Sequence, residues 1–587
     1  MLNSSEARMR KIVVIGLLAT AAMPFAARAQ DAATTVAPSD SSMVNLVRLL
    51  VEQKVLSADK GEALMRQALS EAEAARAVKP APSAAALAPP AAGAVRVPYI
   101  PETVRDQIKA ELRNDVLAQA KQEGWATRDQ AAPDWTRRLT LSGDLRVRSQ
   151  SNLFSKANSD QIFDFARINA GGPYDVAGAT FPFLNTRKDK VNLLGIRARL
   201  NLNVKVSDRV EAGFQLATGD DNSPIATNNL LGGGFGKRDI WLQEAWVELR
   251  PTDWASVTLG RMHNPFVSTG MVFDEDLAFD GVAVELDSGT MISDSVAVKV
   301  RGGAFPLDYG DANYLSTQTT KPSFPQKYLF SGQVELDADV SDDLNVQLAA
   351  GYHHFTNVQG DLSEPCLVGT GVVDCSTDGL RPFFLRKGNT LSYLRQLATV
   401  GGAQLTSLPQ YFGLTFDYRL VDLNLNARFA LDDELEVLAK GNYVRNIGFR
   451  RGDICRNGVL GEPFNNGGTT GLASVPSLCA TTGPKSTFLG GNEAYQGMLR
   501  VGYRNPEQPG QWQFEAGYRY LETDAVLDSF TDSEFHIGGT NYKGYFLGGV
   551  IGIFPKVTFG AHWMSGNEIA GDPLAIDVLQ VEINAKF

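Results

Sequence analysis

One stretch of the sequence decides the fold: Leu194-Gly195-Ile196-Arg197-Ala198-Arg199-Leu200-Asn201-Leu202-Asn203-Val204-Lys205. Apolar residues alternate with small, polar or charged ones along its whole length. Successive side chains of a β-strand point to opposite faces, so a period of two predicts a strand with one apolar and one polar face. The alternation lasts for about 10 residues, which is the length that a tilted strand needs to cross a bilayer.

The same alternation recurs along the chain, for example at 139–148, 296–301, 421–429 and 512–520. We expect sixteen strands, at 139–149, 191–206, 208–218, 239–250, 254–262, 280–287, 294–304, 327–340, 344–355, 411–431 (with its core near 419–431), 434–447, 495–505, 511–523, 540–554, 556–565 and 576–587. The connections alternate between short turns and long loops, which is the pattern of an up-and-down barrel.

Two architectures could use such strands. A soluble sandwich turns the apolar faces inward, whereas a transmembrane barrel turns them to lipid and lines water with the polar faces. An even strand number leaves no edge in the membrane, and a soluble propeller or solenoid would repeat at a fixed period, which the sequence lacks. We therefore expect an all-β transmembrane barrel of about 16 antiparallel strands over residues 138–587.

Composition excludes other classes of protein. The 587 residues carry a formal charge of -11, and a nucleic-acid-binding protein needs a basic footprint. Beyond the N-terminus, the sequence has no apolar run of about 18 residues that could span a bilayer as a helix. It also lacks HExxH and GxSxG sequences, so neither an enzyme nor a cofactor or metal site is predicted.

The N-terminal region has a different composition. Residues 1–29 combine basic residues, a short apolar core and Ala27-Arg28-Ala29, which is typical of an export signal. We expect a helical hairpin or coiled coil at 30–78, an Ala/Pro-rich linker at 79–101 and an amphipathic helix with its lead-in at 102–137. These helices could bind the envelope or serve only as a solvated spacer.

Two segments carry a family resemblance. The last strand runs from Asp577 to Phe587 and ends in Phe, as in outer-membrane barrels. The segment Gly260-Arg261-Met262-His263-Asn264-Pro265-Phe266, with Asp274-Glu275-Asp276-Leu277 and Asp280-Gly281-Val282 after it, resembles the "putative porin" family of Gram-negative bacteria. The resemblance implies a water-filled pore among outer-membrane lipids, and it implies that Phe587 is the signal read by the barrel-assembly machinery.

Four cysteines lie in two of the long loops. Cys366 and Cys375 share one loop, and Cys455 and Cys479 share the other. In an oxidising compartment we expect one disulfide within each loop. A disulfide between the loops, or unpaired thiols, are the alternatives.

The polar faces of the strands supply candidate pore residues. The inward basic residues are Arg146, Arg148, Arg197, Arg199, Lys299, Arg301, Arg500 and Arg519. The resemblance implies that the third long loop, 263–279, folds into the barrel, so that Asp274, Glu275 and Asp276 face the basic wall across a constriction. These charges could instead only pair and rigidify the wall. Because acids also point inward, the sign of ion selectivity stays open.

The leading functional hypothesis is an outer-membrane porin for passive diffusion of small hydrophilic solutes and ions. The alternative is a structural protein that tethers the barrel to the envelope through its N-terminal helices, with peptidoglycan as the candidate partner. A homotrimer is compatible with both hypotheses.

Overall fold

The structure is a computed structural model. It describes residues 136–170, 181–220, 223–310, 324–365, 377–396, 411–467, 477–483 and 485–587, with the backbone of four two-residue strands at 368–369, 372–373, 399–400 and 403–404. The expected export signal, helical segment and linker, and most of the lead-in at 102–137, lie outside the described residues, so these expectations stay predictions.

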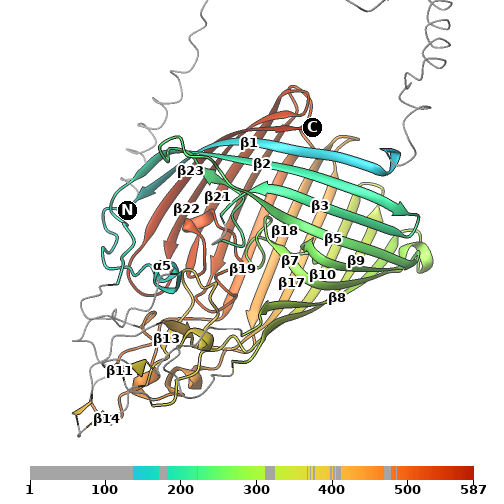
Figure 1. Ribbon diagram of the computed structural model, residues 1–587. Helices are drawn as coiled ribbons and strands as arrows, with labels where there is room; N and C mark the ends of the chain where they lie inside the picture. Colours follow the sequence, from blue (N-terminus) through green and yellow to red (C-terminus); the bar gives the residue numbers. More distant parts are fainter. Residues whose placement is uncertain are drawn as a thin grey trace, which may run out of the picture. The chain divides into compact units, whose positions relative to one another are not determined.

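Sixteen long antiparallel strands form a closed barrel (Figure 1). They are β1 (Leu139–Phe154), β2 (Lys190–Ser207), β3 (Val210–Thr218), β5 (Ile240–Thr252), β6 (Ala255–His263), β7 (Ala278–Asp287), β8 (Val296–Asp308), β9 (Lys327–Ser341), β10 (Leu344–Thr356), β17 (Tyr418–Ala430), β18 (Leu435–Asn446), β19 (Glu493–Tyr503), β20 (Trp512–Leu521), β21 (Tyr542–Phe554), β22 (Val557–Glu568) and β23 (Ala575–Lys586). Each pairs with its neighbours in the sequence, and β1 closes the barrel on β23, from Asp144 opposite Lys586 to Phe154 opposite Ile576.

The remaining elements lie in the connections. They are η1 (Thr136–Arg138), α5 (Phe165–Ala170), β4 (Asn229–Leu230), η2 (Gly289–Met291), β11 (Val368–Gly369), β12 (Val372–Val373), η3 (Asp378–Leu380), β13 (Leu391–Tyr393), β14 (Thr399–Val400), β15 (Ala403–Gln404), β16 (Phe412–Leu414), η4 (Arg451–Cys455), η5 (Val459–Gly461) and η6 (Phe535–Ile537). Within the described residues, none of the helices has the length and apolarity needed to cross a membrane.

The barrel and its sixteen strands are confirmed, but the expected start of the strand at 411–431 is wrong. β17 begins at Tyr418, and Phe412–Leu414 forms the separate strand β16, which pairs with β13. Phe412 is fully buried and packs on Phe464 with 4.7 Å between ring centroids. Burial in this aromatic cluster, rather than extension of the wall, therefore decides the conformation of that segment.

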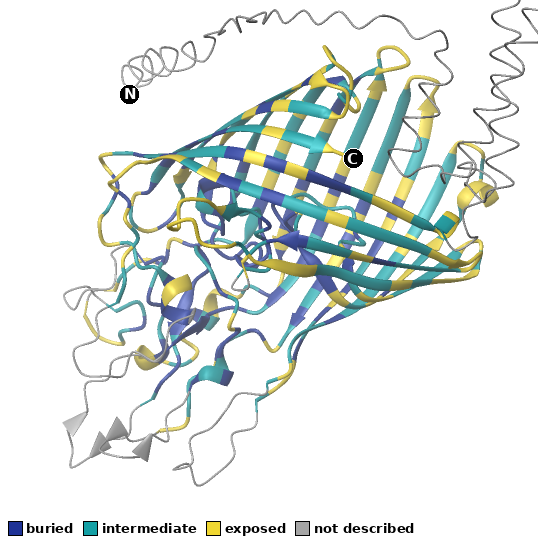
Figure 2. Cartoon of the chain, turned by 45° about the horizontal axis from the view of Figure 1, so that its top comes forward, coloured by how far each residue is buried: buried dark blue, intermediate teal, exposed yellow. Residues whose placement is uncertain are grey.

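The two faces of the wall differ sharply in exposure. On β1, Leu141, Leu145 and Val147 are 62%, 48% and 40% exposed, whereas Asp144, Arg146 and Arg148 between and beyond them are each 7% exposed. Exposed and less exposed residues alternate along the strands (Figure 2). The apolar side chains thus point out of the barrel and the charged ones point inward, as the alternation predicts.

Part of the hydrophobic core lies inside the barrel, between the wall and two inward-folded connections. The first is the β6–β7 loop (264–277), which contributes buried Phe266 and Phe273. The second is the β20–β21 loop (522–541), which contributes buried Leu527 and Phe530. The interior is therefore partly filled by these loops.

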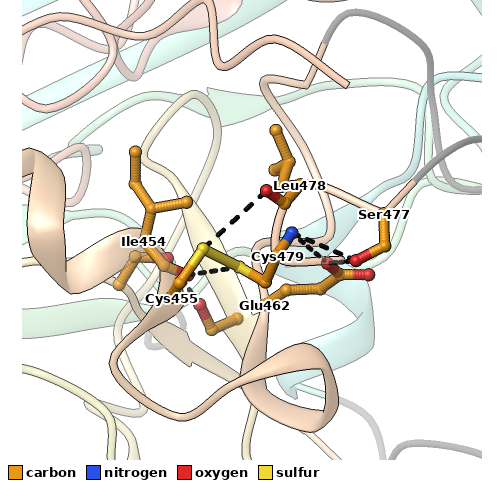
Figure 3. Close-up of a disulfide and its surroundings, with 8 residues drawn as sticks. Ile454, Cys455, Glu462, Ser477, Leu478 and Cys479 are labelled. Atoms are coloured by element: carbon orange, nitrogen blue, oxygen red, sulfur yellow. Dashed lines mark hydrogen bonds between the residues drawn. A yellow bond between two sulfur atoms is a disulfide. The ribbon is translucent and has the colours of Figure 1, made fainter. Parts of the chain in front are cut away.

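One disulfide fastens the β18–β19 loop (447–492). Cys455 and Cys479 are bonded, and the backbone N–H of Cys479 donates to the carboxylate of Glu462 over 3.2 Å (Figure 3). This pairing within one loop is confirmed. Cys366 and Cys375 lie outside the described residues, so their pairing stays a prediction.

Candidate constriction inside the barrel

The β6–β7 loop enters the interior and is bonded to the wall at β9 and β18. The side-chain amide of Gln333 on β9 donates to the carbonyl of Val267 over 2.8 Å and accepts from its N–H over 2.8 Å. The hydroxyl of Thr269 donates to Asn442 on β18 over 2.7 Å. These contacts hold the loop inside the barrel, as the family resemblance implied.

A buried histidine supports the same loop. His353 on β10 is fully buried, and the rings of Phe266 and Phe273 pack edge-on against it at 5.5 Å and 5.1 Å between centroids. Its Nδ1 lies 2.9 Å from the hydroxyl of Ser331. The period of two places His353 on the inward face, but the sequence alone does not reveal the two phenylalanines that cover it.

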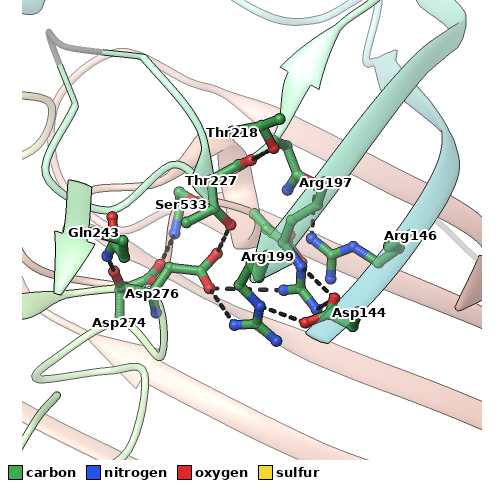
Figure 4. A network of polar contacts seen from close by, with 12 residues as sticks. Asp144, Arg146, Arg197, Arg199, Thr218, Thr227, Gln243, Asp274, Asp276 and Ser533 are labelled. Atoms are coloured by element: carbon green, nitrogen blue, oxygen red, sulfur yellow. Dashed lines mark hydrogen bonds and ion pairs between the residues drawn. The ribbon is translucent and has the colours of Figure 1, made fainter. Parts of the chain in front are cut away.

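On its return, the β6–β7 loop contacts the basic wall directly (Figure 4). The carboxylate of Asp276 lies 3.6 Å from the Arg197 guanidinium and 3.4 Å from that of Arg199, and both arginines also pair with Asp144. The resemblance implies that Asp276 faces the basic wall across a constriction. Its carboxylate contacts the arginines of β2 directly, which is the pairing that the alternative interpretation describes.

The β20–β21 loop is a second inward loop, which the sequence analysis missed. Its Phe530 carbonyl accepts from the N–H of Asp274 over 2.7 Å, and the N–H of Asp532 donates to the carbonyl of Gly270 over 2.7 Å. The N–H of Ser533 donates to the Asp274 carboxylate over 3.0 Å. The apolar run Ala525-Val526-Leu527, with Phe530 after it, is the sequence signal that could have indicated burial.

Two further inward-facing arginines, Arg148 and Arg519, also form ion pairs with acidic side chains. Arg148 on β1 pairs with Glu534 of the β20–β21 loop and, over 2.7 Å, with Glu582 on β23. Arg519 on β20 lies 3.0 Å from Asp532 of the same loop. The arginines are therefore divided between the two inward loops. Asp276 of the β6–β7 loop pairs with Arg197 and Arg199 on β2. Asp532 and Glu534 of the β20–β21 loop pair with Arg519 on β20 and Arg148 on β1.

Burial changes the acidity of one carboxyl group in the β6–β7 loop. Asp274 is 7% exposed, and this burial, with the nearby carboxylates of Asp532 and Asp276, raises its pKa to about 8. The backbone N–H groups of Asp276 and Ser533 act in the opposite direction by donating to its oxygens. Near neutral pH, Asp274 therefore carries a proton in this arrangement.

A cavity of about 690 Å³ lies between the two loops and the wall from β18 to β1. Its lining includes eight charged residues predicted from the sequence: Arg146, Arg148, Arg197, Arg500, Arg519, Asp274, Glu275 and Asp276. Arg199, Lys299 and Arg301 do not line it. Arg301 instead pairs with Glu285 and Glu335, and Lys299 lies 3.2 Å from Asp287. These three residues lie outside this cavity, and the pore role of the whole predicted set stays a prediction.

The lining also contains residues that the sequence analysis left out of its basic and acidic sets, such as Lys440 on β18 and Glu534. Lys440 occupies an inward-facing position in the alternation of β18, so the period of two could have identified it. Glu534 could not, because only the tertiary fold brings its loop into the barrel. Among the described residues, no group of three or more His, Cys, Asp or Glu side chains is placed to hold a metal ion.

The terminal residue lies at the seam where the barrel closes. The backbone of Phe587 exchanges two hydrogen bonds with Gly143 on β1, of 3.1 Å and 3.0 Å. Its ring covers Gly143 so closely that a Cβ atom at that position would lie 2.5 Å from the ring. A role of Phe587 in assembly stays a prediction, and the seam gives it a structural role as well.

A comparison with protein families shows which class of protein this barrel belongs to. Residues 40–587 match the family described as "Putative porin". The chain belongs to this porin family. The porin barrel is therefore an outer-membrane channel of bacteria, and family and fold favour a channel over an enzyme.

Several solved porin-like barrels resemble this porin. OprB of Pseudomonas putida is 12% identical, with a TM-score of 0.38 and coverage of 77% of this chain and 95% of that one. The outer membrane channel DcaP of Acinetobacter baumannii is 10% identical, with a TM-score of 0.34 and coverage of 76% and 97%. OmpF of Salmonella typhi, in complex with daunomycin, is 10% identical, with a TM-score of 0.36 and the same coverage.

These likenesses carry no argument about this porin. A comparison with curated proteins finds no match. The family does not favour the tether hypothesis. Attachment to peptidoglycan, a homotrimer and the periplasmic placement of the N-terminal segment stay predictions.

Proposed function

We propose that this porin conducts small hydrophilic solutes and ions by passive diffusion through a water-filled passage. The passage runs between the two inward loops and the wall from β18 to β1. One observation carries the proposal: a cavity lined by charged side chains lies inside a barrel whose outer face is apolar. Such a lining suits water and polar solutes, because a polar solute that loses part of its hydration shell there gains contacts with charged side chains in exchange.

The charge balance of the lining supports weak selectivity between anions and cations. Six Lys or Arg residues and seven Asp or Glu residues line the cavity. Most are paired with a partner of opposite charge, such as Arg500 with Glu515 at 2.7 Å. With six basic and seven acidic residues, the two signs nearly cancel. Opposite charges placed close together still create strong local fields, which favour polar solutes that can align.

Reconstitution of the full mature chain tests the proposal. In planar bilayers with a salt gradient, we expect stepwise conductance and a small reversal potential. In liposomes, we expect swelling with monosaccharides that slows as the sugar becomes larger. Protein unfolded by heat serves as the control. Membrane-inserted, heat-modifiable protein that neither conducts ions nor permits swelling would contradict the proposal.

A further inference from the structure

The β20–β21 loop differs from the β6–β7 loop in how it is held. Its first half is fixed firmly: Asn389 of the β10–β17 loop (357–417) donates to the carbonyls of Thr523 and Val526 over 2.6 Å and 2.8 Å. Asp524 accepts two hydrogen bonds from Thr390. These groups are fully buried, so this half is a fixed part of the interior.

The tip of the loop is held more weakly. Asp532, Ser533 and Glu534 are only half-buried, whereas the residues from 523 to 531 and at 535 and 536 are buried. The tip is attached by the backbone hydrogen bonds to the β6–β7 loop and by the ion pairs of Asp532 with Arg519 and of Glu534 with Arg148. Its apolar neighbours belong to the fixed parts of the loop.

The backbone directly after the tip is strained. His536, Ile537, Gly538 and Gly539 have φ values of 54°, 61°, 83° and 82°. A positive φ is uncommon for residues other than glycine and is a clear outlier for the β-branched Ile537. Strained residues of this kind cluster at switch regions. The two glycines allow this segment to change conformation without a steric penalty from a Cβ atom.

The contact between the two loops also brings two carboxyl groups close together. Asp274 of the β6–β7 loop lies against the tip, where the Asp532 carboxylate is its largest charged neighbour. Asp276 of its own loop adds a further negative charge, and Arg386 of the β10–β17 loop adds a positive one. When both carboxyl groups are ionised, their repulsion opposes the backbone hydrogen bonds that hold the tip.

We propose that the tip of the β20–β21 loop, residues 532–534, is a gate that leaves the β6–β7 loop through a change of backbone conformation between Thr531 and Gly539. When docked, the tip narrows the passage. When released, it widens the passage and admits larger polar solutes, so the tip sets the size limit of the channel. This inference rests on the proposed function, because a gate needs a passage to close.

A disulfide between the two loops tests the gate directly. A Cβ atom built on Gly270 would lie 3.3 Å from the Cβ of Asp532, close to the separation of about 3.5–4.5 Å in disulfides. The variant carries Gly270→Cys and Asp532→Cys. We expect spontaneous oxidation to hold the tip docked, and mass spectrometry of peptides verifies the bond.

Single-channel currents and liposome swelling are then measured before and after reduction with dithiothreitol. We expect the oxidised variant to lose its larger conductance level and to exclude disaccharides that the reduced variant admits. The variants with Gly270→Cys alone and Asp532→Cys alone control for each substitution. The unaltered protein controls for reduction of Cys455–Cys479.

Two outcomes would overturn the gate. One is a verified disulfide that leaves conductance and swelling unchanged, since the tip would then be static. The other is failure of the two cysteines to bond under oxidising conditions, since the tip would then not lie against the β6–β7 loop. Absence of conductance in the unaltered protein would instead contradict the proposed function.

Discussion

The wall of the barrel and the loops inside it depend on different kinds of information. The wall follows from a local rule, because alternate residues of a strand face opposite sides, and Arg197 therefore points inward while Ile196 points outward. The inward loops follow from contacts between distant residues, such as the hydrogen bond from Asp532 to Gly270. Changes in the wall should therefore affect assembly, whereas changes in the loops should affect the passage and leave the barrel intact.

Deletion of Phe587 should have the largest effect. It removes two backbone hydrogen bonds to Gly143 at the closing seam and the ring that covers that glycine. The family resemblance also gives this residue the role of assembly signal. We expect a strong loss of heat-modifiable protein in the outer membrane, whereas Phe587→Tyr should retain it. Normal levels after the deletion would show that neither role matters.

The two faces of one strand offer the next test. Leu425 lies near the middle of β17, points outward and is 41% exposed, whereas its neighbour Asn426 points inward and bonds Gln347. An arginine on the lipid face near the bilayer midplane costs about 2–4 kcal/mol. We expect Leu425→Arg to lower the free energy of unfolding in lipid vesicles by that amount.

Asn426→Arg is the matched control, because its side chain enters the aqueous interior. We expect it to change the unfolding free energy much less. Equal losses in the two variants would contradict the assignment of the faces.

The loops should respond to pH. In the docked arrangement the pKa of Asp274 is raised to about 8, and release of the tip into water would return it toward 3.8. The docked state therefore binds a proton more tightly, so acid stabilises docking, and docking weakens as pH rises from about 4 to about 8. We expect the larger conductance level to be occupied more often across this range.

Asp274→Asn supplies the control for this effect. The amide cannot ionise, so most of the pH dependence should disappear while the conductance levels remain. A pH response that is identical in the variant and the unaltered protein would exclude Asp274 as its origin.

The smallest effect should be on ion selectivity. Replacing Arg197 and Arg199 by Gln leaves Asp144 and Asp276 without their partners, which should shift the reversal potential toward cation preference. Asp276→Asn should shift it toward anions. Both shifts should shrink at about 1 M salt, where the screening length is about 3 Å.

Arg301→Gln tests whether position matters for selectivity, because Arg301 points inward but does not line the cavity. We expect it to shift the reversal potential less than Arg197→Gln, because Arg197 lines the cavity. An equal shift would mean that selectivity is set along the whole wall rather than at the two loops.

What could be predicted from the sequence also differs between the wall and the inward loops. All sixteen strands could be predicted, because the alternation around residues such as Leu200 and Leu425 is visible in a short window of sequence. The inward β6–β7 loop was expected only through the family resemblance, and pairing such as that of Asp276 with Arg199 was only the alternative interpretation. The β20–β21 loop could not be placed at all, since its burial depends on partners such as Asn389, which is 134 residues away from Thr523.

Cysteine modification during current recording tests the central claim, which is that ions pass along the polar face between the inward loops and the wall. Lys440 lines the cavity, and the adjacent Ala439 on the same strand points outward. With Lys440→Cys, a negatively charged methanethiosulfonate reagent should reduce the current in a planar bilayer, and Ala439→Cys and the unaltered protein should show no change. Complete modification of Lys440→Cys, verified by mass spectrometry, with an unchanged current would contradict the account.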